Sequence, residues 1–304
     1  MLSLKKKNGQ ASVKADDAVQ SKVDKPGSLP YVWNYIKKSK SAMFGLIVII
    51  SLLVLSFLTP YIFQYGYRDI NIRVQYLTPT FEHPFGCDEV GRDILVRVLY
   101  GAKYTISIGI FATCGGAVAG IMLGAVAGYF GGVTDSLIMR ALDVFQSFPT
   151  ILLAIAIAAA LGPGYWKVIL ACGVTAIPGF ARMMRANILT VRGAEYIEAA
   201  TSINCSTLRI IVRHVIPNAI SPLIVQVAMG IASAGLAASA LSFLGFGVVP
   251  PTPEWGAMLS TARAYIRDYP HMVIFPGAFI MLTVLSFNLI GDAVRDALDP
   301  KLRN

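Results

Sequence analysis

The residue types that most often do chemistry in proteins are thinly spread through this sequence. Its four cysteines, Cys87, Cys114, Cys172 and Cys205, are far apart, with no C-x-x-C pair and no histidine at metal-ligand spacing. This pattern indicates neither a zinc site nor a disulfide framework. The sequence also contains no G-x-x-x-x-G-K-[ST] loop, which would cradle the phosphates of ATP. We therefore expect no catalytic, cofactor or metal site in this chain.

One charged segment separates two strongly apolar ones: VRGAEYIEAATSINCSTLRIIVRHVIP, residues 191–217. In a helix its apolar side chains recur at three- and four-residue steps, which predicts a short amphipathic helix over residues 195–209. The apolar set is Tyr196, Ile197, Ala200, Ile203 and Leu208, and the polar set is Glu195, Glu198, Asn204 and Arg209. The small Ala199 and Ala200 would let another surface approach the backbone closely. This helix either contacts a cytosolic partner or lies on the membrane surface without one.

Two smaller groups of residues also carry predictions. Arg140 and Asp143 are three residues apart in an expected helix, so they share a face and can pair. We interpret them as a structural ion pair, with a gating contact as the alternative. Later in the chain, Pro251 and Pro253 force an extended segment, and Trp255 is the kind of ring that anchors at a membrane interface.

Composition places all these segments in a membrane protein. Of 304 residues, 55% are hydrophobic and only 14% are charged, and the mean hydropathy is +0.62. Such a chain is too apolar for an ordinary soluble domain, so we expect an all-α, polytopic membrane protein. The net charge of +9 does not indicate nucleic-acid binding, because the basic residues flank apolar spans and do not form one patch.

Crossing about 30 Å of hydrocarbon takes roughly 20 apolar residues in a helix. Six stretches are long enough: residues 42–63, 104–128, 137–161, 166–185, 219–248 and 272–290. Residues 1–41 are then a cytosolic tail, flexible up to about Pro30, residues 64–103 an external segment, residues 104–292 the core, and residues 293–304 a cytosolic C-terminal tail. Along the second span, glycines at near-helical steps predict a face on which a neighbouring helix packs closely. They are Gly115, Gly116, Gly120, Gly124 and Gly128.

Basic residues set the expected orientation, because lysine and arginine collect on the cytosolic side of membrane spans. Lys37, Lys38 and Lys40 precede the first span, and arginines outnumber glutamates around residues 182–213. Six crossings return the chain to its starting side. Both termini and the amphipathic helix are therefore expected in the cytosol. We expect Pro217 to end this cytosolic segment, because proline cannot donate a helical hydrogen bond.

The charged segment resembles the coupling loop of importer-type ABC permeases, which has an E-A-A head, a glycine and an I-x-L-P tail. The matching residues are Glu198, Ala199, Ala200, Ile216 and Pro217. Asn204 stands where glycine is usual, and His214 stands where isoleucine is usual. After glycine, asparagine adopts a left-handed backbone conformation most readily. The turn expected at the glycine position can therefore form with Asn204.

Four further stretches resemble the permease subunits of peptide and nickel ABC importers: His83–Gly109, Gly128–Pro149, Leu241–Leu259 and Phe275–Leu302. They include the sequence PPTPEWG, which is not a general membrane pattern. Within that family, the chain is similar to the second, C-type permease subunit. Cys87 replaces the usual threonine of a G-T-D motif, which exchanges one small residue for another.

The resemblance implies a type I ABC importer permease fold in the bacterial plasma (inner) membrane. Its implied partners are a homologous permease, two ATPases that bind ATP and magnesium, an external solute-binding protein and membrane lipid. The implied ATPase-coupling residues are Glu195, Glu198, Ala199, Ala200, Ile203, Asn204 and Pro217, and the implied docking residues for the binding protein are Pro251, Pro253, Glu254 and Trp255. Peptides are the expected substrate, and nickel or a metal chelate is the alternative within the family. An ion-coupled secondary transporter or a non-transporting scaffold would be a different class, but the spans hold almost none of the acidic residues that a proton relay uses.

Overall fold

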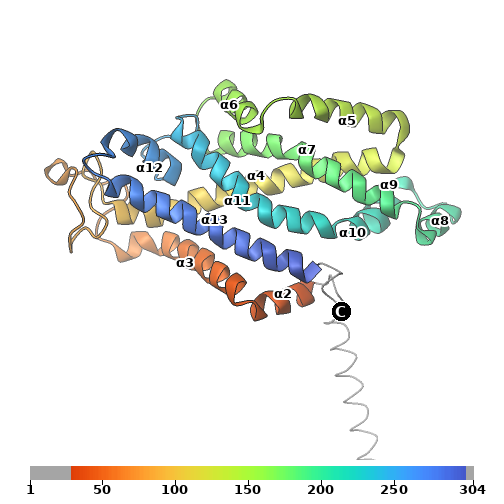
Figure 1. Ribbon diagram of the computed structural model, residues 1–304, viewed down its shortest axis with the longest axis horizontal. Helices are drawn as coiled ribbons and strands as arrows, with labels where there is room; N and C mark the ends of the chain where they lie inside the picture. Colours follow the sequence, from red (N-terminus) through yellow and green to blue (C-terminus); the bar gives the residue numbers. More distant parts are fainter. Residues whose placement is uncertain (1–28, 299–304) are drawn as a thin grey trace, which may run out of the picture.

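The computed structural model describes residues 29–298 as a bundle of long helices (Figure 1). Within that range the only β pairing is an isolated bridge between Cys87 and Asp93, so the all-α prediction is confirmed. Most of the predicted N-terminal tail and the end of the C-terminal one, residues 1–28 and 299–304, lie outside the described residues. Figure 1 shows the helix α12, Trp255–Ala262, at one end of the bundle and α8, Glu195–Ser202, at the other. We call these two regions the α12 end and the α8 end.

Five single helices in the described range are long and apolar enough to cross a membrane. They are α3 Lys40–Ile62, α4 Ile94–Phe130, α7 Tyr165–Val191, α11 Ser221–Phe243 and α13 His271–Leu298. Each overlaps one of the predicted spans. The largest difference is at α4, which begins well before the predicted residue 104, because the Asp93 side chain caps the helix by accepting a hydrogen bond from the Val96 N–H at 2.8 Å.

The third predicted span is not one continuous helix. Its place is taken by α5 Gly132–Gln146 and α6 Thr150–Leu161, which are bent by 87° relative to each other. The break precedes α6 at Pro149, which has no N–H to donate and which drives Phe148 out of the helical region. The prediction of a single helix over residues 137–161 was therefore wrong, and a sixth span exists only if α5 and α6 count as one.

Glycines of the second span allow α4 to pack closely against α7. A methyl group at Gly116, Gly120 or Gly124 would collide with backbone atoms of α7, and one at Gly128 would be tight against the same helix. The predicted packing face is thus confirmed for these four glycines. Gly115 does not belong to it, because nothing lies within 4 Å of a methyl group placed there.

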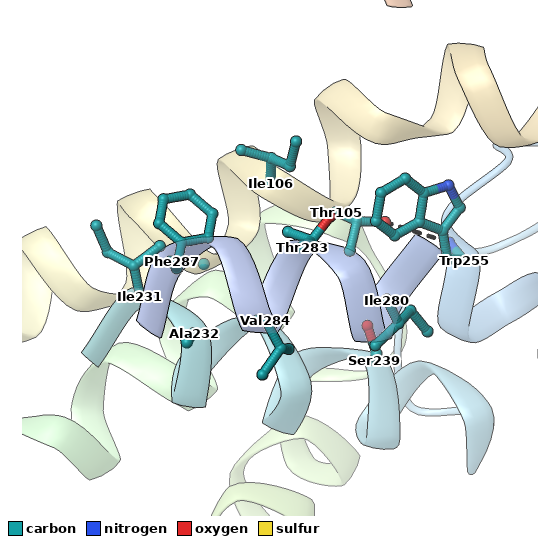
Figure 2. A pocket seen from close by; sticks show the side chains of 12 residues that line it. Thr105, Ile106, Ile231, Ala232, Ser239, Trp255, Ile280, Thr283, Val284 and Phe287 are labelled. Carbon is teal, nitrogen blue, oxygen red and sulfur yellow. Dashed lines mark hydrogen bonds between the residues drawn. The ribbon is translucent and has the colours of Figure 1, made fainter. Parts of the chain in front are cut away.

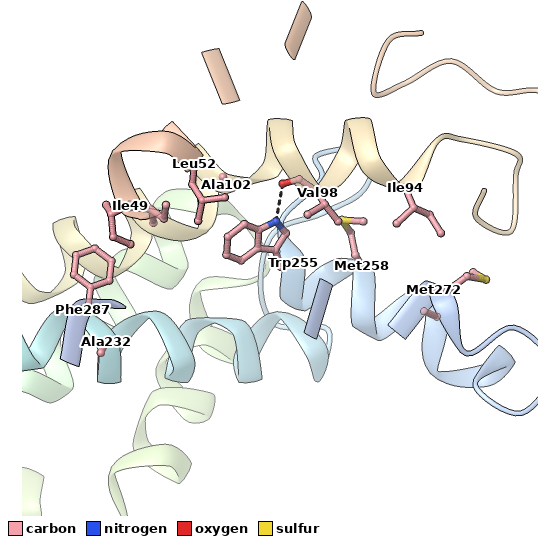
Figure 3. Packing of buried hydrophobic residues seen from close by; sticks show 12 residues of the cluster. Ile49, Leu52, Ile94, Val98, Ala102, Ala232, Trp255, Met258, Met272 and Phe287 are labelled. Carbon is pink, nitrogen blue, oxygen red and sulfur yellow. Dashed lines mark hydrogen bonds between the residues drawn. The ribbon is translucent and has the colours of Figure 1, made fainter. Parts of the chain in front are cut away.

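A buried apolar cluster joins α3, α4, α12 and α13 near the α12 end (Figure 3). Trp255 is completely buried in it, and the indole Nε1 donates a hydrogen bond to the Val98 carbonyl of α4 at 2.9 Å. Figure 3 shows Ala102 and Met258 close to this ring. Burying so large a ring removes about 150–250 Å² from water or lipid, so α12 is held as a fixed part of the bundle.

Shorter elements gather at both ends. The α8 end continues through α9 Thr207–Ile210, the π-helix η2 Ile211–Val215 and α10 Ile216–Ala219. The α12 end adds the 3₁₀ turns η1 Ile72–Val74 and η3 Arg263–Tyr265. The helix α2, Leu29–Lys38, packs against the last part of α13, on the side of the α8 end (Figure 1). The first and last described residues therefore lie toward the same end of the bundle as α8.

Candidate functional site at the two ends of the bundle

The predicted amphipathic helix is shorter than expected and has two apolar faces. It ends at Ser202 instead of continuing to residue 209. Ile197 and Ala200 point inward, at 4% and 6% exposure, and belong to a buried cluster with Ile210 and Val215. The prediction that Ala200 contacts another protein is therefore wrong, because this residue packs against the chain's own next helix.

The outward face of the same segment carries large apolar side chains. Tyr196, Ile203, Leu208 and Val212 are 44%, 76%, 72% and 56% exposed. We call these four residues the coupling patch. Of the other predicted coupling residues, Glu195, Glu198, Ala199, Asn204 and Pro217 are all exposed. Charged and apolar side chains thus alternate on one short segment, as expected for a surface that another protein covers.

A left-handed turn at Asn204 joins α8 to α9. Asn204 has φ = 58°, the Cys205 N–H donates to the Ala200 carbonyl at 3.1 Å, and the Asn204 N–H donates to Thr201 at 2.9 Å. These two bonds form a Schellman motif with asparagine at the position where glycine is most common. The prediction that the turn survives without glycine is confirmed. The turn fixes the angle at which Ile203 is presented.

Pro217 does not break the helix at its position, and the end of the cytosolic segment at this residue stays a prediction. The chain is helical from Thr207 to Ala219, and Pro217 lies in the first turn of α10, where a proline is tolerated. The π-helix η2 comes directly before α10. This wider turn accommodates a residue that cannot donate the helical hydrogen bond to the preceding turn.

Ion pairs tie α5 to α7 near the α8 end. Arg185 of α7 contacts both carboxylate oxygens of Asp135, with an Nη2 to Oδ2 distance of 2.6 Å, and Arg182 contacts Asp143 at 2.8 Å. The predicted pair between Arg140 and Asp143 is wrong, because the carboxylate of Asp143 reaches across to α7. The second pair is exposed and contributes little, typically below about 1 kcal/mol.

The α12 end differs because its charged side chains are inside. Glu254 is completely buried and caps α12, accepting hydrogen bonds from the N–H groups of Gly256 at 2.9 Å and Ala257 at 2.8 Å. The hydroxyls of Thr105 and Ser239 each lie 3.3 Å from the same carboxylate, and so connect α12 to α4 and α11. Burial raises the pKa of the Glu254 carboxyl above its usual value, although the N–H groups of Gly256 and Ala257 and the Ser239 hydroxyl oppose the shift.

Figure 2 shows how Thr105, Ser239 and Trp255 converge beside Thr283 of α13. The backbone N–H of Trp255 donates to the Thr105 hydroxyl at 3.2 Å. Next to them lies a cavity of about 20 Å³, and the Thr283 hydroxyl on its wall has no hydrogen-bond partner among the described residues. The helices α4, α11, α12 and α13 therefore meet at one small polar centre.

This geometry corrects the predicted docking surface. Pro253, Glu254 and Trp255 are all buried, so they cannot touch a docked protein, and only Pro251 is exposed. Trp255 is a core residue and not an interface anchor, because its indole N–H finds a partner inside the bundle. The sequence could not distinguish these two roles, since tryptophan serves both.

The segment between α3 and α4 also holds buried charges. Asp88 pairs with Arg92 at 2.6 Å and lies 3.5 Å from Arg97, and Arg97 donates to the carbonyls of Tyr67 at 3.0 Å and Pro251 at 3.4 Å. Beside this pair, His83 contacts Asp93 at 2.7 Å. The sequence analysis did not assign these residues, although the density of opposite charges in HPFGCDEVGRD was a visible signal. Among the described residues, no group of three or more His, Cys, Asp and Glu side chains is arranged to hold a metal ion.

Comparison with known proteins places this geometry among transporter subunits. Residues 120–304 match the family described as "Binding-protein-dependent transport system inner membrane component", and residues 30–79 match "N-terminal TM domain of oligopeptide transport permease C". The chain is 44% identical to the dipeptide transport system permease protein DppC of Alkalihalophilus pseudofirmus over 88% of each chain. It is also 44% identical to the glutathione transport system permease protein GsiD of Escherichia coli O6:K15:H31, over 89% of this chain and 90% of GsiD. An inward-facing structure of the MetNI methionine ABC transporter shares the fold, with a TM-score of 0.53 and 17% identity over 67% of this chain and 97% of the other.

Proposed function

Because the chain belongs to the family of inner membrane components of binding-protein-dependent transport systems, we propose that it is the permease subunit of an ATP-driven importer for dipeptides or oligopeptides. The two relatives named above carry the names of a dipeptide and a glutathione permease, and both substrates are peptides. The chain itself is a multi-pass protein of the bacterial inner membrane. Its proposed role is non-catalytic.

The observation that carries this proposal is the coupling patch. Four large apolar side chains on the charged stretch from Tyr196 to Val212 at one end of the bundle are costly to leave in water, and a protein groove would cover them. The partner that fits is an ATPase, because the chain contains no phosphate-binding loop and its energy must be supplied from outside. A second ATPase would bind a homologous permease in the same way.

Orientation follows from the charges at the α8 end. Arg182, Arg185, Arg192, Arg209 and Arg213 lie on or near this end, and Lys37 and Lys38 of α2 precede the first span. The positive-inside rule then assigns the α8 end to the cytosol and the α12 end to the outside. An external solute-binding protein would meet the loops around the α12 end, where Pro251 is exposed.

The proposed mechanism is alternating access driven through the coupling patch. ATP binding would close the ATPases and displace α8. This movement would shift α7 and α11, which connect to the two ends of the segment from α8 to α10, here called the coupling segment. The turn at Asn204 and the buried contacts of Ile197 would transmit the displacement, because they fix α8 to the helices that follow. Hydrolysis would return the subunit to the inward-facing state.

Purification of the tagged chain tests this proposal. The chain is tagged at its N-terminus, extracted from its native membrane in a mild detergent, and the proteins that accompany it are identified by mass spectrometry. We expect two ATPases and a second permease, and we expect cells that lack the chain to lose uptake of a labelled trialanine probe. Recovery of the chain alone in several detergents, together with unchanged peptide uptake, would contradict the proposal.

A further inference from the structure

A half-open polar pocket lies where the break between α5 and α6 meets α4, α7 and α11. Its volume is about 350 Å³, and its wall includes residues near the middle of the spanning helices. The polar members of this wall are Thr113, Gln146, Thr150, Thr175, Gln226 and Ser233. Hydrogen-bonding side chains on membrane-spanning helices are costly where hydrocarbon surrounds them, because hydrocarbon offers them no partner. We call this cavity the midspan pocket.

Two side chains of the midspan pocket have hydrogen-bonding atoms that no protein group satisfies. The Thr113 hydroxyl is on a residue only 1% exposed, and it has no partner among the described residues. The Oε1 atom of Gln226 is also buried and has no hydrogen-bond partner among the described residues. Burying a hydroxyl or an amide without a partner costs several kcal/mol in a non-hydrogen-bonding medium, so groups of this kind indicate a ligand or water in the pocket.

The broken span adds further donors to the same wall. α6 begins at Thr150, and Pro149 before it offers no side-chain cap for the first N–H groups of the helix. Non-helical backbone at membrane depth is tolerated where it lines a cavity or is buried in protein, and discontinuous helices often form transport sites. The pocket wall thus includes Thr150, the first residue of the uncapped helix α6, together with the unpartnered side chains of Gln226 and Thr113.

The lining also selects a ligand chemistry, because none of its residues is Asp, Glu, Lys, Arg or His. It therefore offers no charge to a terminal amine, a terminal carboxylate or a charged side chain. Glutamine can donate and accept simultaneously, which matches a peptide amide group. The rest of the wall is mainly small, with Gly179, Gly230 and several alanines, and leaves room for varied side chains.

We propose that the midspan pocket contacts the backbone amide groups of a peptide in transit, through Gln226, Thr113 and the start of α6. This inference rests on the proposed function and deepens it, since it assigns the stretch of pathway that this subunit supplies. Recognition of the backbone alone allows peptides of many sequences to pass. Because the contact is made after delivery, it changes the rate of translocation and not the concentration of peptide that half-saturates uptake.

The test uses whole cells in which the native gene carries the variant, with labelled trialanine as the probe. For Thr113→Val, which keeps the shape and removes the hydroxyl, we expect a maximal uptake rate about threefold to tenfold lower, at an unchanged half-saturating concentration. Thr283→Val is the matched control, because Thr283 is also buried with an unpartnered hydroxyl but lies outside the midspan pocket. This control should retain the uptake rate.

A second probe shows whether the contact is made to the peptide backbone. Trialanine with N-methylated amides lacks the N–H donors, so the wild-type protein should transport it more slowly. Gln226→Leu should slow unmodified trialanine about threefold to tenfold and change uptake of the methylated probe much less, because the lost partner is the same. If Gln226→Leu slowed uptake of both probes by the same factor, the proposed contact between Gln226 and the peptide backbone would be overturned.

The outcomes separate this inference from the proposed function. If the wild-type protein supports no trialanine uptake and no uptake of other short peptides, the proposed function fails, and the inference fails with it. If the wild-type protein transports trialanine and Thr113→Val transports it equally well, only the midspan pocket is excluded. A higher melting temperature of that variant would then show that the hydroxyl was simply an unsatisfied group.

Discussion

The two ends of the bundle differ in which charged and apolar side chains they bury and which they expose. At the α12 end, Glu254, Asp88 and Arg97 are buried and paired, and Trp255 is completely enclosed. At the α8 end, Glu198 is exposed, and so are the large apolar side chains of the coupling patch. The charged groups buried at the first end are bonded within the chain. Glu198 and the coupling patch at the second end face outward.

This difference indicates which end is complete without partners. A buried carboxylate that caps a helix and collects two hydroxyls stabilises the subunit itself, so damage there should appear as loss of stability. Exposed Ile203 and Leu208 add little to the subunit alone, so damage there should appear as loss of association. Substitutions at the α12 end should therefore change thermal unfolding, whereas substitutions at the α8 end should change recovery of the ATPases.

The largest effect is expected for Trp255→Ala at the α12 end. Removing a completely buried ring leaves a cavity and loses the indole hydrogen bond to the Val98 carbonyl, at a cost of about 3–5 kcal/mol in the free energy of unfolding. The measurement is the apparent melting temperature of the assembly in mild detergent, with the amount of folded protein in the membrane. Trp255→Phe, which keeps most of the ring, should recover much of the loss. A wild-type melting temperature in Trp255→Ala would show that the α12 end does not stabilise the subunit.

Much of this arrangement could be predicted from the sequence, and the exceptions have physical reasons. Hydropathy located five spans, because a run of about 20 apolar residues leaves a membrane helix few alternatives. It missed the break before Pro149, since the apolar stretch continues on both sides and mean hydropathy does not register a missing N–H group.

The candidate site was predictable only in part. Periodicity found the outward-facing Ile203 and Leu208, but it assigned Ala200 to the same surface, because one helical pattern cannot say which apolar face meets the chain itself. The roles of Trp255 and Glu254 depend on contacts with α4 and α11, which are far away in sequence. The midspan pocket was missed for the same reason.

Glu254→Ala tests the polar centre of the α12 end. Loss of the cap leaves two N–H groups and two hydroxyls without their acceptor, and we expect about 2–3 kcal/mol of lost stability. Burial raises the pKa of Glu254, so the stabilisation is complete below the unfolded pKa of about 4.3 and declines as pH rises through the folded value. The difference in melting temperature between wild type and variant should therefore be larger near about pH 5 than near about pH 8. A difference that grows with pH would show that the four donors hold the carboxylate ionised.

A smaller effect, about 1–2 kcal/mol in binding, is expected for Leu208→Asp at the α8 end. A charge in place of a 72% exposed leucine leaves the fold intact but opposes burial in an ATPase groove. Recovery of ATPase with the tagged chain should fall about tenfold, with an unchanged melting temperature for the subunit. The matched control is Ile266→Asp, a similar change at a 52% exposed isoleucine of the α12 end, which should recover ATPase normally. Equal losses in both variants would mean that the coupling patch has no special role.

The smallest effect is expected at Asn204, which joins the two halves of the coupling segment. Its left-handed backbone, φ = 58°, costs alanine about 1 kcal/mol more than asparagine, whereas glycine adopts it freely. Asn204→Ala should speed hydrogen exchange of the α8 amides about fivefold, and Asn204→Gly should leave exchange at the wild-type rate or slow it. Hydrogen exchange followed by mass spectrometry measures this directly, and exchange in α12 serves as the internal reference because the α12 end does not contact the turn. If alanine and glycine had the same effect, the turn would not limit the opening of α8, and the segment would transmit movement through the contacts of Ile197 alone.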